Sequence, residues 1–218
     1  MAIRYLTSGE SHGKALMGIL EGIPSGLAVS SGDIDSDLRR RQGGHGRGGR
    51  MKIEADRANI LSGIRFGKTI GSPIALLIKN KDWQNWQDVM SVTPLTPPLN
   101  KEGSKGGLVA SPRPGHADLA GAVKYDTHDM RNILERSSAR ETAMRVALGA
   151  IAKRFLSEFG IKIGSYIIQI GKVQSSKLKI KSSEKELLEA FRSAEISPVR
   201  CPDKTSSKNM VSLIDKAL

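Results

Sequence analysis

The chain has 218 residues, of which 39% are hydrophobic and 26% charged, and this composition is typical of a folded globular protein. No apolar run reaches the roughly 18 residues of a membrane span, and the N-terminus lacks the apolar stretch of a signal peptide. Cys201 is the single cysteine, which excludes an intrachain disulfide and a thiolate metal cluster. We therefore expect a cytoplasmic protein, and the formal charge of +12 indicates an anionic partner.

The first half of the chain is predicted to be rich in strands. Alternating apolar residues predict strands over 3–7 and 15–23, joined by the loop Gly9-Glu10-Ser11-His12-Gly13. A short helix is expected to begin at Gly32-Asp33 and to turn basic at its end, and strands are expected over 51–54, 60–66 and 70–78. Residues 93–115 form a long loop rich in Pro, Gly, Ser and Thr, and such loops are usually functional or disordered.

The second half is predicted to be mainly helical. Apolar residues recur near the 3.6-residue period over 132–159, and Gly160 then gives a plausible end to the helix. A strand over 161–170 and helices over 184–195 and 206–218 follow. Because the strands come first and the long helix follows, the order favours an α+β sandwich over βαβ units. The last helix has no terminal turn signal, so we expect the sequence to be cut there.

The loop at Ser11 and His12 is the first candidate site. An imidazole between small residues can approach a ligand closely, and its titration near neutral pH suits an acid or a base. A surface or capping histidine is the alternative that spacing alone favours.

Arginines and glycines crowd the segment after the first helix, with Arg39, Arg40, Arg41, Arg47 and Arg50 among five glycines. Glycines let backbone N–H groups reach an anion, and guanidinium groups bind phosphate or carboxylate in pairs. Three interpretations stay open: an RNA-binding segment, a pocket for a small phosphorylated acid, or a solvated basic loop. The strands expected downstream argue against a disordered tail, and the low aromatic content of 4% argues against a stacking platform.

Two later segments also combine cations with small residues. Arg113-Pro114-Gly115-His116-Ala117-Asp118 brings a histidine next to a glycine, although a turn histidine is the more common case. Glu135-Arg136-Ser137-Ser138-Ala139-Arg140-Glu141-Thr142 places hydroxyl groups and arginines at the start of the long helix. Free N–H groups and the helix dipole favour an anion there, and a serine cap with surface charges is the alternative. No metal-ligand spacing occurs.

Taken together and in this order, the four segments resemble the chorismate synthase family. Residues 9–13 with 20–24 are similar to its first signature, residues 41–51 to its substrate-binding loop, and 113–118, 136–142 and 197–203 to further blocks. The resemblance covers nearly the whole chain and implies an α+β fold, a β-α-β sandwich of antiparallel sheets packed with a long helix, incomplete at the C-terminus. Residues 1–218 would be the N-terminal part of a single domain, with 93–115 a long loop within it.

The resemblance implies a lyase that eliminates phosphate from 5-enolpyruvylshikimate 3-phosphate to give chorismate, with reduced FMN as cofactor and NADPH as a flavin reductant in some members. It also implies a homotetramer at full length, with no nucleic-acid or membrane partner. The family's C-terminal blocks, which supply further flavin contacts, are absent from this sequence. A truncated, non-catalytic fragment and a basic nucleic-acid-binding protein are therefore the alternatives.

The resemblance also implies roles for individual residues. His12 would protonate the leaving phosphate and His116 the reduced flavin. The remaining roles are substrate binding by Ser11, Arg41, Arg47, Arg50, Arg113 and Arg140, FMN binding by Arg136, Ser137 and Ser138, and NADPH binding by Arg41 and Arg47.

Overall fold

The structure is a computed structural model that describes residues 2–46, 55–90, 109–175 and 183–217. The chain divides into two compact units, which we describe one at a time. The larger unit comprises Met1–Arg41 and Ile53–Phe155, and the smaller comprises Gln42–Lys52 and Leu156–Leu218. The prediction that 1–218 belongs to a single domain stays a prediction.

The larger unit contains a four-stranded antiparallel sheet with the order β1-β2-β6-β3. Its strands are β1 (Arg4–Gly9), β2 (Ala15–Glu21), β3 (Ala58–Ser62) and β6 (Ile74–Lys79). In β2 and β6 buried residues alternate with more exposed ones, because successive side chains of a strand point to opposite faces. The register sets Leu16 opposite Ile78 and Leu20 opposite Ile74, so these buried residues share one face.

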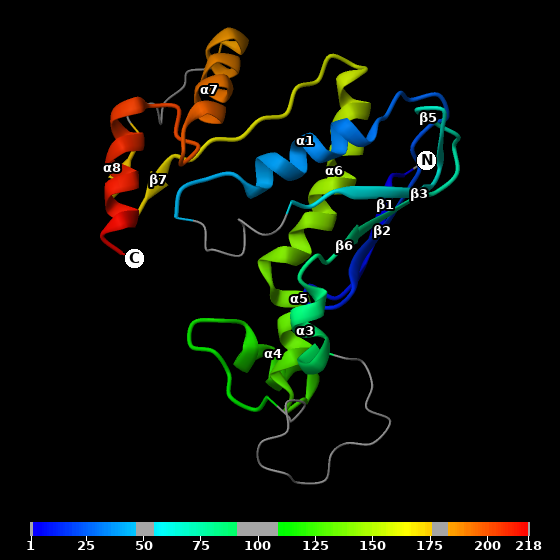
Figure 1. Cartoon of the computed structure of the whole chain (residues 1–218). Coiled ribbons are helices and arrows are strands. Elements are labelled where there is room, and N and C mark those ends of the chain that lie inside the picture. Colours follow the sequence, from blue (N-terminus) through cyan, green and yellow to red (C-terminus); the bar gives the residue numbers. More distant parts are fainter. Residues whose placement is uncertain (1, 47–54, 91–108, 176–182, 218) are drawn as a thin grey trace. The chain divides into compact units, whose positions relative to one another are not determined.

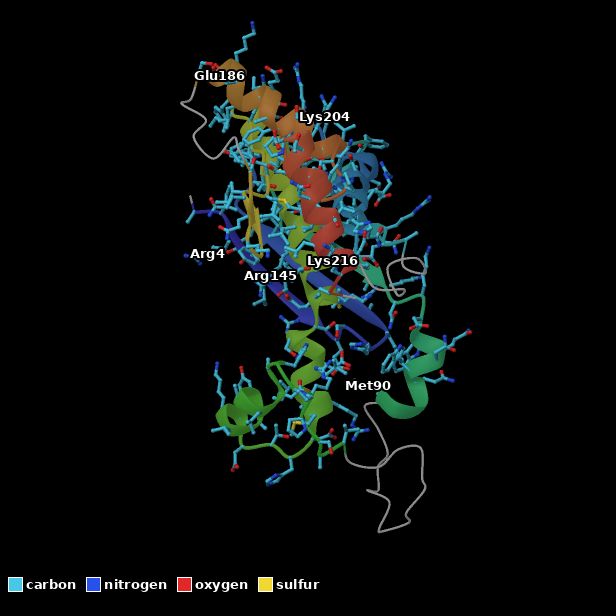
Figure 2. The ribbon with its side chains drawn as sticks, turned by 90° about the vertical axis from the view of Figure 1, so that its left-hand side faces the viewer. Arg4, Met90, Arg145, Glu186, Lys204 and Lys216 are labelled. Carbon is cyan, nitrogen blue, oxygen red and sulfur yellow. The ribbon has the colours of Figure 1, made fainter. Side chains whose placement is uncertain are left out.

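A long helix, α6 (Thr142–Ser157), packs on that buried face of the sheet, as Figures 1 and 2 show from two sides. A Cβ atom added at Gly18 of β2 would lie 2.6 Å from Met144 Sδ and 2.9 Å from Leu148 Cδ1. The absence of a side chain at Gly18 therefore lets helix and strand approach closely. The helix α1 (Ser31–Gln42) adds two fully buried residues, Ile34 and Leu38, to the same core.

The helix predicted over 132–159 is interrupted. It consists of α5 (Met130–Ser137), a 3₁₀ turn η1 (Ala139–Glu141) and α6. Ser138 breaks the run because its backbone is extended (φ −63°, ψ 140°) and its side chain accepts a hydrogen bond from the N–H of Arg140. Serine favours such capping positions because its hydroxyl replaces a missing backbone partner. Because of this break, α6 is a separate helix with its own N-terminus at Thr142.

The larger unit also contains two further helices and one hairpin. The helices are α3 (Trp83–Met90) and α4 (Asp118–Tyr125), and neither was predicted from the sequence. The hairpin pairs β4 (Ile64–Arg65) with β5 (Lys68–Thr69). β4 falls within the strand predicted over 60–66, whereas β5 lies between that range and the strand predicted over 70–78.

The smaller unit has its own small core, formed by Val199, Cys201 and Met210. Around it lie β7 (Gln169–Ile170), β8 (Val173–Gln174), α7 (Glu184–Ile196) and α8 (Lys204–Asp215). The two helices confirm the sequence prediction. The strand predicted over 161–170 is wrong for 161–168, where the backbone has no regular structure.

Two sequence predictions fall on segments that the structure does not describe, or describes only in part. The strand predicted over 51–54 and most of the long loop 93–115 lie outside the described residues. In the described part of the chain, no helix has the length and apolar character needed to cross a membrane.

Candidate active site

The loop after β1 turns tightly and presents Ser11 and His12. Gly9 has φ +86°, and a Cβ atom there would lie 2.4 Å from the carbonyl oxygen of Ala15, so a larger residue would clash. Within the loop, the N–H of Gly13 donates to the carbonyl of Glu10 at 3.2 Å. The turn thereby returns the chain into β2 and leaves Ser11 and His12 at its apex.

His12 is almost completely buried, and four side chains contact it. Its Nδ1 lies 2.8 Å from Ser11 Oγ, and its backbone N–H donates to Glu135 Oε2 at 2.8 Å. The side-chain amide of Asn80 donates to its carbonyl at 3.2 Å. The ring of Trp86 meets the imidazole edge-on, with 4.5 Å between ring centroids. This imidazole is fixed from several elements, so the interpretation of His12 as a surface histidine is wrong.

A hollow of about 650 Å³ lies beside this loop, which is within the range of small-molecule sites (about 300–1,000 Å³). Glu135 and Arg136 of α5, Trp83 of α3, and Glu10 and Lys14 of the loop line it. The wall carries charges of both signs and an aromatic ring. Such a wall can contact both charged and apolar parts of a ligand.

Arg136 is held over the end of β1 at this hollow. Its guanidinium donates to the carbonyl of Gly9 at 3.2 Å, to Thr7 Oγ1 at 3.0 Å and to Glu141 Oε1 at 3.2 Å. Burial raises the pKa of Glu141, but hydrogen bonds from Arg145 and Thr7 and the charges of Arg145 and Arg136 outweigh it and hold the pKa below its usual value. The ionised Glu141 therefore fixes the orientation of Arg136.

Arg41 and Arg140 meet at a residue that the sequence did not single out, Asp56. Arg140 donates to Asp56 Oδ1 at 3.2 Å and to the carbonyl of Lys79 at 3.1 Å. Arg41 donates to Asp56 Oδ2 at 3.5 Å and to Thr142 Oγ1 at 3.1 Å. The side chains of Asp56 and Arg140 are only 2% and 3% exposed. Two guanidinium groups with one carboxylate leave one net positive charge in this cluster.

His116 belongs to a different cluster, before α4. Its Nδ1 lies 2.9 Å from Arg113 and 3.1 Å from Asp118 Oδ1. Arg113 donates to Asp118 through its backbone N–H and two guanidinium nitrogens, at 3.0, 2.8 and 2.7 Å. These hydrogen bonds hold the pKa of Asp118 well below its usual value despite burial, and they raise the pKa of Arg113. The carboxylate therefore stays ionised next to His116.

Ser137 and Ser138 follow Arg136 at the end of α5. Ser138 caps η1, as the capping interpretation of this segment expected. The Oγ of Ser137 is buried and has no hydrogen-bond partner among the described residues. Ser137 and Arg136 line a second hollow of about 790 Å³, with Gly121 and Lys124 of α4 on another wall. A buried hydroxyl without a partner is unusual in a folded protein and indicates a place for a bound polar group.

Arg47 and Arg50 lie outside the described residues. The preceding residues up to Gly46 are described, and His45 among them contacts other residues of the smaller unit. His45 donates its N–H to the carbonyl of Pro198 at 2.8 Å, and its Nε2 lies 2.5 Å from Asp215 Oδ1. The sequence offered no partner for His45, because Asp215 lies 170 residues away.

The structure thus groups the described candidates around separate centres. Ser11 and His12 form one with Arg136 close by, Arg41 and Arg140 form a second, and Arg113 with His116 forms a third.

Comparison with known proteins identifies the family. Its profile, described as chorismate synthase, matches residues 3–218. The chain belongs to the chorismate synthase family. It is 54% identical over 215 residues to the chorismate synthase of Symbiobacterium thermophilum and 52% identical over 215 residues to that of Bacillus subtilis, covering 99% of this chain and 54% of each relative. It is 52% identical over 221 residues to the chorismate synthase of Aquifex aeolicus, covering 98% of this chain and 53% of that relative.

A solved structure gives the same family. A crystal structure of chorismate synthase superposes with a TM-score of 0.75 and 44% sequence identity, covering 99% of this chain and 53% of that one. The antiparallel sheet packed with helices is therefore the fold of chorismate synthases, as predicted. The chain spans about half the length of the curated relatives it matches.

Proposed function

We propose that this chain supplies the proton-donating and anion-binding part of a chorismate synthase site, which eliminates phosphate from 5-enolpyruvylshikimate 3-phosphate to give chorismate. The observation that carries the proposal is that a buried, firmly held His12 is bound by Glu135, which lines a hollow together with Arg136. Relatives that are about half identical to this chain bear the chorismate synthase name. The cation surplus of the sequence suits a substrate with one phosphate and two carboxylates.

His12 is the proposed general acid. As the bond between the substrate carbon and the phosphate oxygen breaks, His12 donates a proton to that oxygen, and phosphate leaves. A positioned acid of this kind contributes about 10²–10⁴ in rate. Ser11, whose Oγ lies 2.8 Å from His12 Nδ1, orients the ring, and we assign it to the substrate site as well.

The arginines stabilise the negative charge of the substrate and of the leaving phosphate. Arg41 and Arg140 share Asp56, and Arg113 is fixed by Asp118, so these cations are oriented before a ligand arrives. Preorganised charges avoid the cost of reorganisation during the reaction. Arg47 and Arg50 complete the proposed substrate set.

The residues at the end of α5 fit FMN. The buried Oγ of Ser137 lies in the wall of the 790 Å³ hollow beside Arg136, and a phosphate or hydroxyl of the cofactor would satisfy it. Ser138 uses its oxygen as a cap but keeps a hydroxyl proton to donate. When bound, reduced FMN supplies electron density transiently and takes up the hydrogen that leaves the substrate. His116, next to the ionised Asp118, holds a proton for the reduced flavin. NADPH binding by Arg41 and Arg47 and a homotetramer of the full-length protein stay predictions.

The test is a titration of the purified chain with FMN and with substrate, followed by measurement of phosphate and chorismate release. The full-length Bacillus subtilis relative serves as the positive control. His12→Ala should lower turnover at least about tenfold while FMN affinity stays the same. If the chain neither binds FMN nor releases phosphate under conditions where the relative does both, it is a non-catalytic fragment. Salt-sensitive binding of an oligonucleotide in place of FMN would favour the nucleic-acid alternative.

A further inference from the structure

Glu135 is a buried carboxylate in the short helix α5. It is 6% exposed, like Met130 and Ile133, the two other buried residues of this helix. Transferring a carboxylate from water to such a position is unfavourable unless polar partners compensate. The contacts of Glu135 therefore indicate its role.

Glu135 makes three contacts with the loop at Ser11 and His12. Its backbone carbonyl accepts the N–H of Ser11 at 3.3 Å. One carboxylate oxygen, Oε2, accepts the N–H of His12 at 2.8 Å, and the other, Oε1, lies 3.7 Å from His12 Nδ1. A single residue 123 positions along the chain thus holds both the backbone and the ring of the proposed acid.

We infer that Glu135 is a positioning residue for His12, which fixes the backbone of the loop and favours the protonated imidazole. Burial of His12 opposes a positive charge on the ring, whereas an anion within about 4–6 Å stabilises it. A general acid must carry its proton when the substrate arrives, so this carboxylate keeps His12 in the form that can donate. The inference rests on the proposed function only in calling His12 the acid.

Other charged groups at the same hollow differ from Glu135 in their placement. Glu10 and Lys14 come from the loop between β1 and β2, and Arg136 comes from α5 with its guanidinium donating to Gly9 and Glu141. From α3 the ring of Trp86 contacts the imidazole, and from the end of β6 the neutral amide of Asn80 contacts the backbone of His12. Glu135 is the carboxylate for which the structure gives both a hydrogen bond and an ion-pair distance to His12.

The experiment follows the imidazole signals of the four histidines by NMR across pH, using the whole chain without ligand. His12→Gln identifies the signal of His12. In Glu135→Gln an amide oxygen can still accept the N–H of His12, but the charge is gone. We expect the titration midpoint of His12 to fall by about one pH unit, the lower end of the effect of a nearby opposite charge. Glu10→Gln removes the same charge from the same hollow and should move the midpoint much less.

Two further measurements keep the inference falsifiable if Glu135→Gln does not fold. Glu135→Asp keeps the charge but withdraws it, so its midpoint should lie between those of the wild type and Glu135→Gln. In the wild-type chain, His12 should titrate at a higher pH in the folded protein than in urea. A folded midpoint at or below the unfolded one, or equal midpoints in wild type and Glu135→Gln, would overturn the inference.

Turnover distinguishes this inference from the proposed function. If the function is correct, Glu135→Gln should lower kcat more than it raises KM and should shift the alkaline limb of the kcat profile to lower pH. If the NMR midpoints shift as expected but His12→Ala leaves turnover unchanged, the link between Glu135 and His12 stands and the role of His12 as acid fails. If turnover depends on His12 while the midpoints do not depend on Glu135, the reverse holds.

Discussion

The two histidine clusters of the larger unit differ in how they are built. His116 is held by Arg113 and Asp118, which lie within five residues of one another, and its side chain is 34% exposed. His12 is held by Glu135 from another element, and its side chain is 6% exposed. A cluster that a short segment makes by itself can form before the rest of the fold. A buried cluster assembled from distant elements exists only when the sheet and helices have packed, so its charges should be coupled more strongly to stability.

The largest effect should come from Asp56, the buried carboxylate between Arg41 and Arg140. Asp56→Asn leaves two guanidinium groups with little exposure and no compensating negative charge from this position. Breaking a buried ion pair from one side costs about 3–5 kcal/mol. We expect a loss of that size in the free energy of unfolding, measured by urea denaturation followed by circular dichroism.

The matched control for Asp56 is Asp37→Asn. Asp37 pairs with Lys153 at 2.8 Å, but these side chains are 20% and 47% exposed. Exposed pairs contribute about 0–1 kcal/mol, so this variant should be nearly neutral. If Asp56→Asn and Asp37→Asn lowered the free energy of unfolding equally, burial would not be the property that makes one ion pair more important for stability than another.

Asp118 should produce a smaller, pH-dependent effect. Hydrogen bonds from Arg113 lower its pKa in the folded state below the unfolded value of about 3.9. Its contribution to stability is therefore complete above that value and is lost as the pH falls through the lower, folded pKa. We expect Asp118→Asn to cost about 2 kcal/mol at pH 7, the size of a hydrogen bond to a charged group, and to flatten the loss of stability on acidification.

Arg113→Gln removes the side-chain hydrogen bonds that contribute most to the lowered pKa of Asp118. This variant should therefore also lose less stability than the wild type as the pH falls. The measurement is the free energy of unfolding between about pH 5 and pH 2, where carboxylates with lowered pKa values take up protons. Asp129 and Glu141 also have lowered pKa values, so the wild-type slope includes them and the difference between variants isolates Asp118. An acid limb that is as steep in Asp118→Asn as in the wild type would contradict the assignment.

The contrast between local contacts, as at His116, and contacts between distant residues, as at His12, also explains what could be predicted from the sequence. Periodicity predicted β1, β2, α1, α7 and α8, because each pattern lies within its own element. It missed the break at Ser138, where a local hydroxyl contact overrides a helical apolar pattern. Over 161–168 the alternation predicted a strand, but a strand also needs a hydrogen-bonding partner, which no local pattern reveals.

Among the site residues, the motif residues Ser11, His12 and Arg140 could be named, but their partners could not. Asp56 is 84 residues from Arg140, and Glu135 was quoted in a motif without a role. One signal was available: a carboxylate directly before the Arg136-Ser137-Ser138 run, in a helix whose other buried residues are apolar. A charged residue that is buried without an apparent partner in its own element needs one from elsewhere.

The smallest loss of stability should come from breaking the pair of His45 and Asp215 in the smaller unit. This pair tests whether burial or separation along the sequence determines the size of the loss. The two residues are far apart in sequence, like His12 and Glu135, but their side chains are 34% and 54% exposed, like the cluster at His116. If burial rather than sequence separation determines the effect, Asp215→Asn should cost about 0–1 kcal/mol in urea unfolding. The difference should vanish at 1 M salt, where charges are screened within about 3 Å. A salt-independent loss above about 2 kcal/mol would instead show that the contact of His45 with α8 stabilises the smaller unit through its geometry. Distance along the chain would then matter more than exposure.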